Sequence, residues 1–266
     1  MFTLKNFSAS DVQAVYSGAE GQLWELIMGE KIHIGGMPSS IDLATFGGVQ
    51  GGMAVADFCC CSGSGMRFLL KLCGARHASG VDFTKEQLAL GKKRMAAADI
   101  TPSQYRFYLG DASQPHLKEA SVDLVWSEDA WCYVADKPGL LAQTKRALKP
   151  DGKVVFSDWV GTDKLTAAEA KRFMTFMKFP TLMTVEDWAK LLAKTGFQNV
   201  KTRVSPYFAP SMKHYIAMYT GQQSYDALRL LGFNEEMYVA VLDEMLFFLE
   251  LAKAKKIAQA YFAAVK

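Results

Sequence analysis

The sequence lacks long hydrophobic runs, a clustered basic region and the cysteine spacing of a cross-linked protein. Its longest apolar stretches, such as MLFFL at 245–249, are far too short to cross a bilayer. The first residues, MFTLKNFSASDVQAVYSG, show no basic segment followed by an apolar one, as a secretion signal would. We therefore expect a cytoplasmic protein with no membrane partner.

An excess of charge of one sign is also missing. The 266 residues carry a formal net charge of +3, and the lysines and arginines are scattered along the chain. Nucleic-acid binding usually needs a basic face, so we expect no nucleic-acid partner. Half of the residues are hydrophobic, which is enough for the core of one large domain. We find no repeat, no low-complexity segment and no linker.

The cysteines are few and oddly placed. There are five in all, at positions 59, 60, 61, 73 and 132. An odd number in a long chain is not the pattern of a disulfide framework, so we expect reduced thiols. Three are consecutive, in ADFCCCSGSGMRF at 56–68. Zinc sites usually separate paired cysteines by about two to four residues, because neighbouring side chains on an extended backbone point to opposite faces. We therefore expect no metal at Cys59, Cys60 and Cys61.

The residues around the three cysteines predict a strand, a tight turn and a helix. MAVADFCC at 53–60 is a short apolar run, SGSG follows it, and MRFLLKLCG carries apolar residues at helical spacing up to Gly74. ASGVDF at 78–83 predicts a second strand. Thr84 and Gln87 have the spacing of a capping box for the helix after it. The unit is thus strand, helix, strand, helix.

This alternation continues along the chain. Three more strands are predicted at 105–112, 121–130 and 152–159, the last preceded by a helix from about Lys137 to Leu148 and a turn at KPDG. Strands that alternate with helices predict an α/β fold, in which helices cover both faces of a mostly parallel sheet.

Beyond Trp159 helices dominate the sequence. We predict two helices that each open on a threonine cap, at 166–179 and 184–196, and a sixth strand at 197–204. A long helical segment follows at about 223–254, and a final strand, inserted antiparallel, at 256–266.

The ends of the predicted strands carry acidic residues. In an open parallel sheet, ligands bind beyond the carboxyl ends of the strands. A dinucleotide-binding loop would read G-x-G-x-x-G, but Phe68 stands where the third glycine is needed after Gly63 and Gly65. Asp82 ends the second strand, where a carboxylate accepts hydrogen bonds from both ribose hydroxyls. Asp111 ends the third strand, where it would accept from an adenine amino group. The sequence predicts a ligand with a nucleoside and a free ribose.

Taken in order, VADFCCCSGSG, GVDFT, LGDA, SVDLVWSEDAW and ALKPDGKVVFSDW resemble the class I S-adenosylmethionine-dependent methyltransferases over about residues 50–160. In that family the first motif reads roughly D-h-G-x-G-x-G, with h apolar. Asp57 matches the acid, Cys59 and Cys61 take the first two glycine positions, and Gly63 keeps the third. We interpret the cysteines as part of a cofactor loop, with Cys60 buried against the sheet. Oxidation of thiols beside the cofactor is left open.

The resemblance implies a cofactor, S-adenosyl-L-methionine, and a Rossmann-like sheet of seven strands with a helical lid insertion. One continuous domain would divide into a helical cap (1–50), a cofactor-binding core (51–160), and a lid with the last two strands (161–266). The residues expected to bind the cofactor are Asp57, Cys59, Cys61, Gly63, Asp82, Phe83, Gln87, Gly110, Asp111, Ala112, Ser127 and Glu128.

Two flanking motifs point to a subgroup. VYSGAEGQLWELIMGEKIHIGG at 15–36 resembles the amino-terminal cap of the sarcosine and dimethylglycine N-methyltransferases, and of their relatives that methylate phosphoethanolamine or tocopherol precursors. VWSEDAWCYVADK resembles the fourth-strand motif of the same group, where the position of Tyr133 often carries histidine. The resemblance places Tyr16, His33 and Trp131 near the methyl-transfer centre, and Tyr133 is expected there because it follows the fourth strand. His33 is equally well explained as a buried histidine with satisfied hydrogen bonds.

The acceptor is expected to be a small molecule. Candidate residues for contact with it are Trp159, Arg203, Tyr207 and His214. Three hypotheses remain: N-methylation of a small amine such as a glycine derivative, which leads; O- or C-methylation of an aromatic or isoprenoid-like molecule; and a non-catalytic protein that binds S-adenosylmethionine or S-adenosylhomocysteine. A homo-oligomer also stays open.

Overall fold

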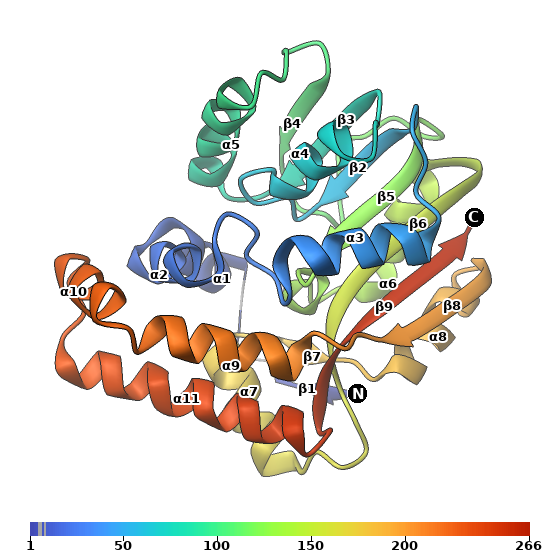
Figure 1. Cartoon of the computed structure of the whole chain (residues 1–266). Coiled ribbons are helices and arrows are strands. Elements are labelled where there is room, and N and C mark those ends of the chain that lie inside the picture. Colours follow the sequence, from blue (N-terminus) through green and yellow to red (C-terminus); the bar gives the residue numbers. More distant parts are fainter. Residues whose placement is uncertain (5–6, 8) are drawn as a thin grey trace.

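The computed structural model describes residues 1–4, 7 and 9–266, and its centre is a seven-stranded sheet (Figure 1). The strands are β2 (Ala54–Phe58), β3 (His77–Asp82), β4 (Tyr105–Leu109), β5 (Val122–Glu128), β6 (Leu148–Gly161), β8 (Gln198–Val204) and β9 (Ile257–Val265). Their order is β4-β3-β2-β5-β6-β9-β8. The first five are parallel to one another, and β9 is antiparallel to both of its neighbours. The predicted α/β sheet with an antiparallel last strand is confirmed.

Helices cover both faces of this sheet. On one face, α6 (Lys137–Ala147) and α8 (Val185–Lys194) pack against apolar side chains of β2, β5, β6 and β9. On the other face lie α3 (Gly36–Gly47), α4 (Ser64–Lys71) and α5 (Lys85–Ala97). Each central strand therefore has buried side chains on both sides, which explains why β2 reads as a continuous apolar run broken only by Asp57.

A second group of helices packs at the carboxyl end of β6. It comprises α2 (Ala19–Met28), α7 (Ala167–Met177), α9 (Phe208–Tyr219), α10 (Gln222–Leu230) and α11 (Glu235–Lys253), and it shares an apolar core with Trp159 at the end of β6. In Figure 1, α9 and α11 run side by side, and α1 (Ala9–Ser17) and α2 lie between them and α5. None of the helices in the described part of the chain is long and apolar enough to span a membrane.

Two of the three predicted capping boxes are present. The Thr166 and Thr184 side chains accept hydrogen bonds from the backbone three residues on, at the starts of α7 and α8. At α5 the prediction was wrong, because the Thr84 side chain makes no such bond. The Thr84 N–H instead donates to Asp82 Oδ1 at 2.9 Å, and the Gln87 amide donates to the Tyr16 carbonyl at 2.7 Å.

Other local predictions also needed correction. The helical segment expected at 223–254 is two helices, because the chain turns at Gly232 (φ 88°) and the Asn234 side chain caps α11. The stretch before it forms α9, which was not predicted. KPDG, expected as a turn, lies within β6 as a bulge between two register positions opposite β5. A small antiparallel pair, β1 (Phe2–Thr3) with β7 (Thr181–Leu182), was not expected.

Candidate functional site

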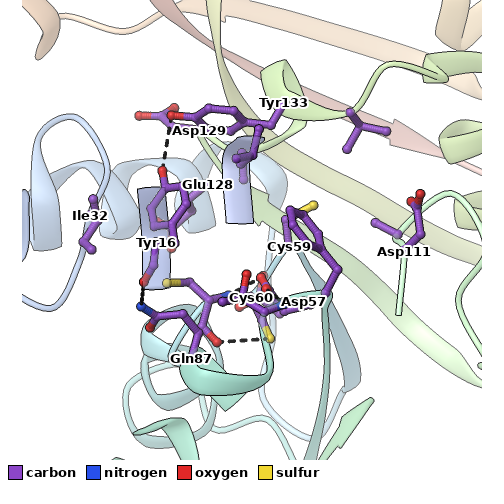
Figure 2. Close-up of a pocket in the computed structure, with 18 of the residues that line it drawn as sticks. Tyr16, Ile32, Asp57, Cys59, Cys60, Gln87, Asp111, Glu128, Asp129 and Tyr133 are labelled. Atoms are coloured by element: carbon purple, nitrogen blue, oxygen red, sulfur yellow. Dashed lines mark hydrogen bonds between the residues drawn. The ribbon is translucent and has the colours of Figure 1, made fainter. Parts of the chain in front are cut away.

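A cavity of about 380 Å³ lies at the carboxyl ends of β2, β3, β4 and β5, where the sequence predicted a ligand site (Figure 2). Its floor is the loop between β2 and α4, and residues that follow β3, β4 and β5 form its sides. Residues of α1 and of the loop between α2 and α3 close it from above the sheet. We call this space the outer cavity.

The floor of the outer cavity is a left-handed turn built by cysteines. Cys59 and Cys61 have φ angles of 63° and 49°, and Gly63 has 75°. Such angles favour glycine, because a β-carbon crowds the following carbonyl. The N–H groups of Cys59 and Cys60 both donate to the Val81 carbonyl, at 2.8 and 3.1 Å. The loop thus keeps the glycine-type conformation at the two positions where the resemblance expects glycine, with a thiol on each.

Asp82 ties this loop to the next strand. Its Oδ2 accepts a hydrogen bond from the Cys61 N–H at 2.8 Å, and its Oδ1 accepts from the Thr84 N–H. The carboxyl group is buried, and burial raises its pKa although the N–H donors lower it. Asp82 is also one of the residues that line the cavity.

Asp57 approaches the start of α4 very closely. A β-carbon at Gly65 would lie 2.5 Å from Asp57 Oδ2, so any other residue there would displace the Asp57 carboxylate. Burial and the nearby Glu128 carboxylate raise the pKa of Asp57 well above its usual value. Two acidic groups therefore face the same part of the cavity.

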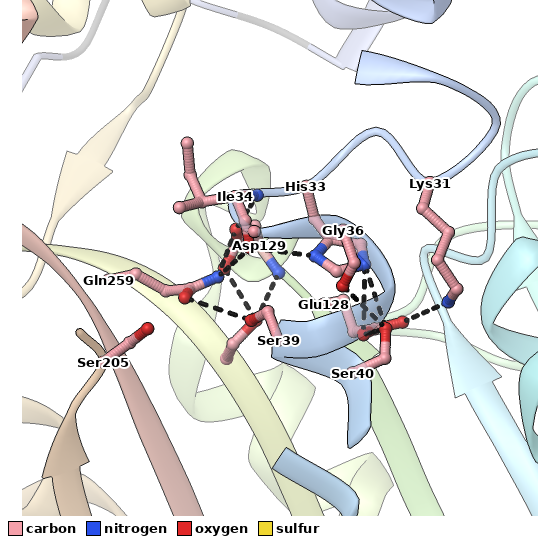
Figure 3. Close-up of polar contacts among 12 residues, drawn as sticks. Lys31, His33, Ile34, Gly36, Ser39, Ser40, Glu128, Asp129, Ser205 and Gln259 are labelled. Carbon is pink, nitrogen blue, oxygen red and sulfur yellow. Dashed lines mark hydrogen bonds and ion pairs between the residues drawn. The ribbon is translucent and has the colours of Figure 1, made fainter. Parts of the chain in front are cut away.

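Glu128 is the centre of a polar cluster (Figure 3). Its Oε1 accepts a hydrogen bond from Ser40 Oγ at 2.5 Å and lies 3.2 Å from His33 Nε2. Lys31 Nζ is 3.6 Å from Oε2. Burial raises the pKa of Glu128, but His33, Lys31 and Ser40 outweigh burial and hold it below its usual value. Glu128 is therefore ionised, and it fixes the orientation of the His33 ring.

Asp129 joins the strands to the amino-terminal segment. Its Oδ2 accepts from the Ile34 N–H at 2.8 Å and from Gln259 Nε2 at 2.7 Å, and its Oδ1 accepts from Ser157 Oγ at 2.6 Å (Figure 3). Burial raises the pKa of Asp129 to about 6. One side chain thereby connects β5, β6, β9 and the loop before α3.

Two tyrosines meet at the wall of the outer cavity. The hydroxyls of Tyr16 and Tyr133 are 3.2 Å apart and their rings pack edge to face (Figure 2). Burial raises the pKa of both phenols, so they are uncharged hydroxyls at neutral pH. Tyr16 lies on α1 and Tyr133 follows β5.

Behind these tyrosines is a smaller space of about 50 Å³, which we call the inner cavity. Five residues line both spaces: Tyr16, Ile32, His33, Asp129 and Tyr133. The rest of the inner wall comes from α2, β6, α7, α9 and α11 and is aromatic or sulfur-containing except for Ile34, with Trp24, Met28, Trp159, Met177, Met212, Tyr215, Met245 and Phe248.

Most of the predicted site residues line these cavities. The outer one is lined by Tyr16, His33, Asp57, Cys59, Cys61, Asp82, Phe83, Gln87, Asp111, Ala112, Glu128 and Tyr133. Trp159 lines the inner one.

Four predicted residues lie behind the walls. Trp131 is fully buried and packs on Phe156, with ring centroids 4.2 Å apart, because its side chain turns into the sheet core. Ser127 is also fully buried, and its hydroxyl donates to the Phe58 carbonyl at 2.8 Å. Gly63 caps α4, and Gly110 donates its N–H to the Asp82 carbonyl. None of these four lines either cavity.

The other acceptor candidates lie elsewhere. Arg203 is on edge strand β8, where its guanidinium pairs with Asp42 at 2.6 Å. His214 is exposed on α9, and Tyr207 packs against Gly35 at the start of that helix. The structure places none of them at a cavity. They were chosen by residue type and not by a motif.

Sequence reasoning also missed residues of both walls. Asp129 had a usable signal, because it follows Glu128 directly at the end of a strand. Trp24, Met28, Met245 and Phe248 had none, because an apolar residue at helical spacing looks the same in a core and in a pocket.

The chemistry of the outer cavity fits the cofactor that the resemblance implies. Carboxyl groups favour a ligand with a cationic sulfur and a cationic amino group, and they accept hydrogen bonds from ribose hydroxyls. No described residue that lines this cavity is a lysine or an arginine. Seven of those residues are acidic: Glu30, Asp57, Asp82, Asp111, Glu128, Asp129 and Asp136.

Comparison with known proteins agrees with this geometry. Residues 56–156 match the family model described as Methyltransferase domain, which confirms the resemblance seen in the motifs. Phosphoethanolamine N-methyltransferase 1 of Arabidopsis thaliana is 24% identical over 178 residues, 66% of this chain and 35% of that protein. The 2-methyl-6-phytyl-1,4-hydroquinone methyltransferase of Synechocystis is 25% identical over 244 residues, 81% of this chain and 74% of that protein.

The fold has a similar counterpart among solved structures. Haemonchus contortus phosphoethanolamine N-methyltransferase 2, in complex with phosphomonomethylethanolamine and S-adenosylhomocysteine, matches with a TM-score of 0.83 at 24% identity. The match covers 97% of this chain and 60% of that one. The present chain thus spans about a third of the length of the Arabidopsis relative and three fifths of the Haemonchus chain.

Proposed function

We propose that this chain, which carries a methyltransferase domain over residues 56–156, transfers a methyl group from S-adenosyl-L-methionine to a small molecule. One observation carries the proposal: the left-handed loop from Cys59 to Gly63, which lies beside the Asp82 carboxylate on the floor of a carboxylate-lined cavity. That arrangement matches the ligand position of open parallel sheets.

The residues of the outer cavity would divide the cofactor among them. Asp82 would accept from the ribose hydroxyls, and Asp111 from the adenine amino group. Asp57 and Glu128 would face the cationic end of the cofactor. When bound, S-adenosylmethionine supplies a methyl group that is already activated on a positively charged sulfur. The protein then has to align the acceptor, the methyl group and the sulfur, and to keep water out.

The electron balance of the transfer is simple. The acceptor atom forms a bond to the methyl carbon, the carbon–sulfur bond breaks, and its electron pair stays on sulfur. A nitrogen acceptor must present a free lone pair, and the methylated nitrogen carries the positive charge until it loses a proton. The Tyr16 and Tyr133 rings line the cavity where that charge develops, and aromatic faces favour cations.

The cap and fourth-strand motifs favour an amine nitrogen as the acceptor atom. The apolar inner cavity supports the alternative, a ring carbon or a phenol oxygen.

A cytoplasmic location remains a prediction from the sequence.

The cofactor site is tested with Asp82→Ala. Loss of the carboxylate should raise the dissociation constant of S-adenosylmethionine at least tenfold in titration calorimetry, while the far-ultraviolet circular dichroism stays that of the wild type. Asp163→Ala is the matched control and should bind normally, because Asp163 is exposed and lines neither cavity. Unchanged affinity in Asp82→Ala would place the ribose elsewhere.

Catalysis is tested separately from binding. Protein incubated with methyl-labelled S-adenosylmethionine and a small-molecule extract should transfer label to one or more compounds, as read by mass spectrometry. Tight, saturable cofactor binding without any transfer would instead indicate a protein that senses the cofactor.

A further inference from the structure

We infer that the acceptor carries no carboxylate or phosphate and places an apolar group in the inner cavity, with its reacting atom beside the hydroxyls of Tyr16 and Tyr133. The inference rests on the proposed function and names the substrate class of the same site.

The first support is the charge of the walls. Seven acidic residues line the outer cavity, and the inner cavity adds no lysine or arginine among its described residues. Glu128 is ionised, and Asp129 is shared by both spaces. Burial raises the pKa of Asp57 and Asp82, so Glu128 carries the clearest negative charge that an anionic acceptor would meet. Like charges within a few ångströms repel strongly where water is excluded.

The nearest cations lie beside acidic groups. Lys31 Nζ is 3.6 Å from Glu128 Oε2, and it is buried without a hydrogen-bond partner among the described residues. Arg67 and Arg94 both form ion pairs with Glu30, and Arg94 pairs with Glu25 as well. His33, the remaining group that can carry a positive charge at the wall, faces Glu128 at 3.2 Å. A phosphate would therefore have to compete with Glu128 for Lys31, or with Glu30 for the two arginines.

The second support is the chemistry of the inner cavity. Trp24, Trp159 and Phe248 offer aromatic surfaces, and four methionines from four different helices complete the wall. Methionine side chains are flexible and polarisable, so they adapt to an apolar group that enters a space of this size. Asp129, the one carboxylate of this wall, already accepts three hydrogen bonds. Aromatic faces and one carboxylate tolerate a neutral or cationic molecule and disfavour an anion.

The third support is the position of the two tyrosines. Because Tyr16 and Tyr133 line both cavities, a molecule that fills the inner cavity meets the outer one at their hydroxyls. Both hydroxyls are uncharged, and either one can donate to or accept from the acceptor. This junction is where an acceptor atom would face the cofactor.

The expected acceptor therefore differs in charge from the phosphomonomethylethanolamine bound by the Haemonchus enzyme, in spite of the shared fold. A matched pair of probes separates the two cases. 2-Phenylethylamine and phenylalanine differ by one carboxylate, and phosphoethanolamine supplies a phosphate without an apolar body.

The experiment uses the full chain saturated with S-adenosylhomocysteine. We expect 2-phenylethylamine to bind with a dissociation constant at least tenfold lower than that of phenylalanine or phosphoethanolamine. Trp24→Ala should weaken 2-phenylethylamine at least fivefold without changing the affinity for S-adenosylhomocysteine. Leu26→Ala is the matched control on the same helix, because Leu26 is 40% exposed and lines neither cavity.

Several results would overturn the inference. Phenylalanine or phosphoethanolamine binding as tightly as 2-phenylethylamine would do so, whichever residue of the chain supplies the positive charge. No binding of 2-phenylethylamine, or binding that Trp24→Ala leaves unchanged, would also do so while the proposed function stands. Failure to bind S-adenosylhomocysteine itself would overturn the proposed function, and the inference with it.

Discussion

Cys59 and Cys61 are the most unusual residues of the site, because their backbone angles are those of glycine. A left-handed conformation costs a residue with a β-carbon about 1–2 kcal/mol. Part of this cost is offset, because glycine loses more conformational freedom on folding than cysteine does, by about 0.5–1 kcal/mol. The balance is small, so the loop tolerates the thiols. The larger effect should fall on the ligand, since each β-carbon stands on the floor of the outer cavity.

Cys61→Gly tests this reasoning. We expect the free energy of unfolding of this variant to be unchanged, or higher by up to about 1 kcal/mol. We also expect it to bind S-adenosylmethionine several times more tightly. Urea denaturation and titration calorimetry give the two quantities. Cys61→Ala removes the thiol but keeps the β-carbon, so it should resemble the wild type. Equal gains in both variants would assign the effect to the sulfur.

Single residues were predictable where a motif fixed both the residue and its backbone. Asp82 ends a strand within such a motif, and the structure places it on the floor of the cavity. Trp131 belongs to a motif too, but its side chain faces the core. The direction of this side chain depends on the turn after β5, and the sequence does not specify that turn. Arg203 was chosen for its charge alone, and Asp42 engages it at the surface.

At the scale of elements, β9 joins the edge strand β8 to the rest of the sheet. It lies between β6 and β8, and it is apolar on both sides because helices cover both faces. Phe262 of β9 is fully buried, stacks on Phe156 of β6 with centroids 4.7 Å apart, and contacts Trp188 of α8. One side chain thus joins two strands and a helix.

Phe262→Ala should therefore be severely destabilising. Deletion of a buried phenylalanine leaves a cavity and typically costs about 3–5 kcal/mol. Leu230→Ala is the comparison, because Leu230 is 90% exposed and should change the free energy of unfolding by less than about 0.5 kcal/mol. Both values come from urea denaturation. A loss below about 1 kcal/mol in Phe262→Ala would mean that the sheet tolerates the gap.

Local signals predicted some of the helix starts. The capping boxes at Thr166 and Thr184 formed as expected, although Glu169 also pairs with Lys256 and Asp187 with the amino-terminal group of Met1. At α5 the Gln87 amide reached a carbonyl of α1 instead, a contact between residues far apart in the sequence. Strands of two residues, such as β1 and β7, depend on such distant contacts and leave no periodic pattern.

At the scale of the whole molecule, the site concentrates buried acid. Burial raises the pKa of Asp57 and Asp82, and it raises those of Asp129 and Asp158 to about 6. A carboxyl group whose pKa is raised in the folded state keeps its proton up to a higher pH than the same group in the unfolded chain. Stability therefore falls as pH rises through the interval between the two values. Without a cationic ligand, this part of the molecule is under electrostatic strain at neutral pH.

The unfolding free energy of the ligand-free protein should accordingly decrease between about pH 4 and pH 6, the interval between the ordinary pKa of aspartate and the raised pKa values of Asp129 and Asp158. A difference of about two pKa units corresponds to a few kcal/mol for each fully coupled group. Asp129→Asn removes one titrating group, so the decrease with pH should be smaller in this variant. A difference in the free energy of unfolding that is the same at every pH does not affect this comparison. Denaturation in urea at several pH values measures both slopes. A wild-type stability that rises over this interval, or a variant with the same slope, would contradict the assignment.

The place of β9 also bears on how the chain is made. Translation releases the amino-terminal part first, so β8 emerges from the ribosome before β9, the strand it pairs with. Until residues 257–265 have been synthesised, β6 has an open apolar edge and β8 has nowhere to dock. Open strand edges recruit other chains, so we expect the edge of β6 to be prone to such pairing until β9 occupies it.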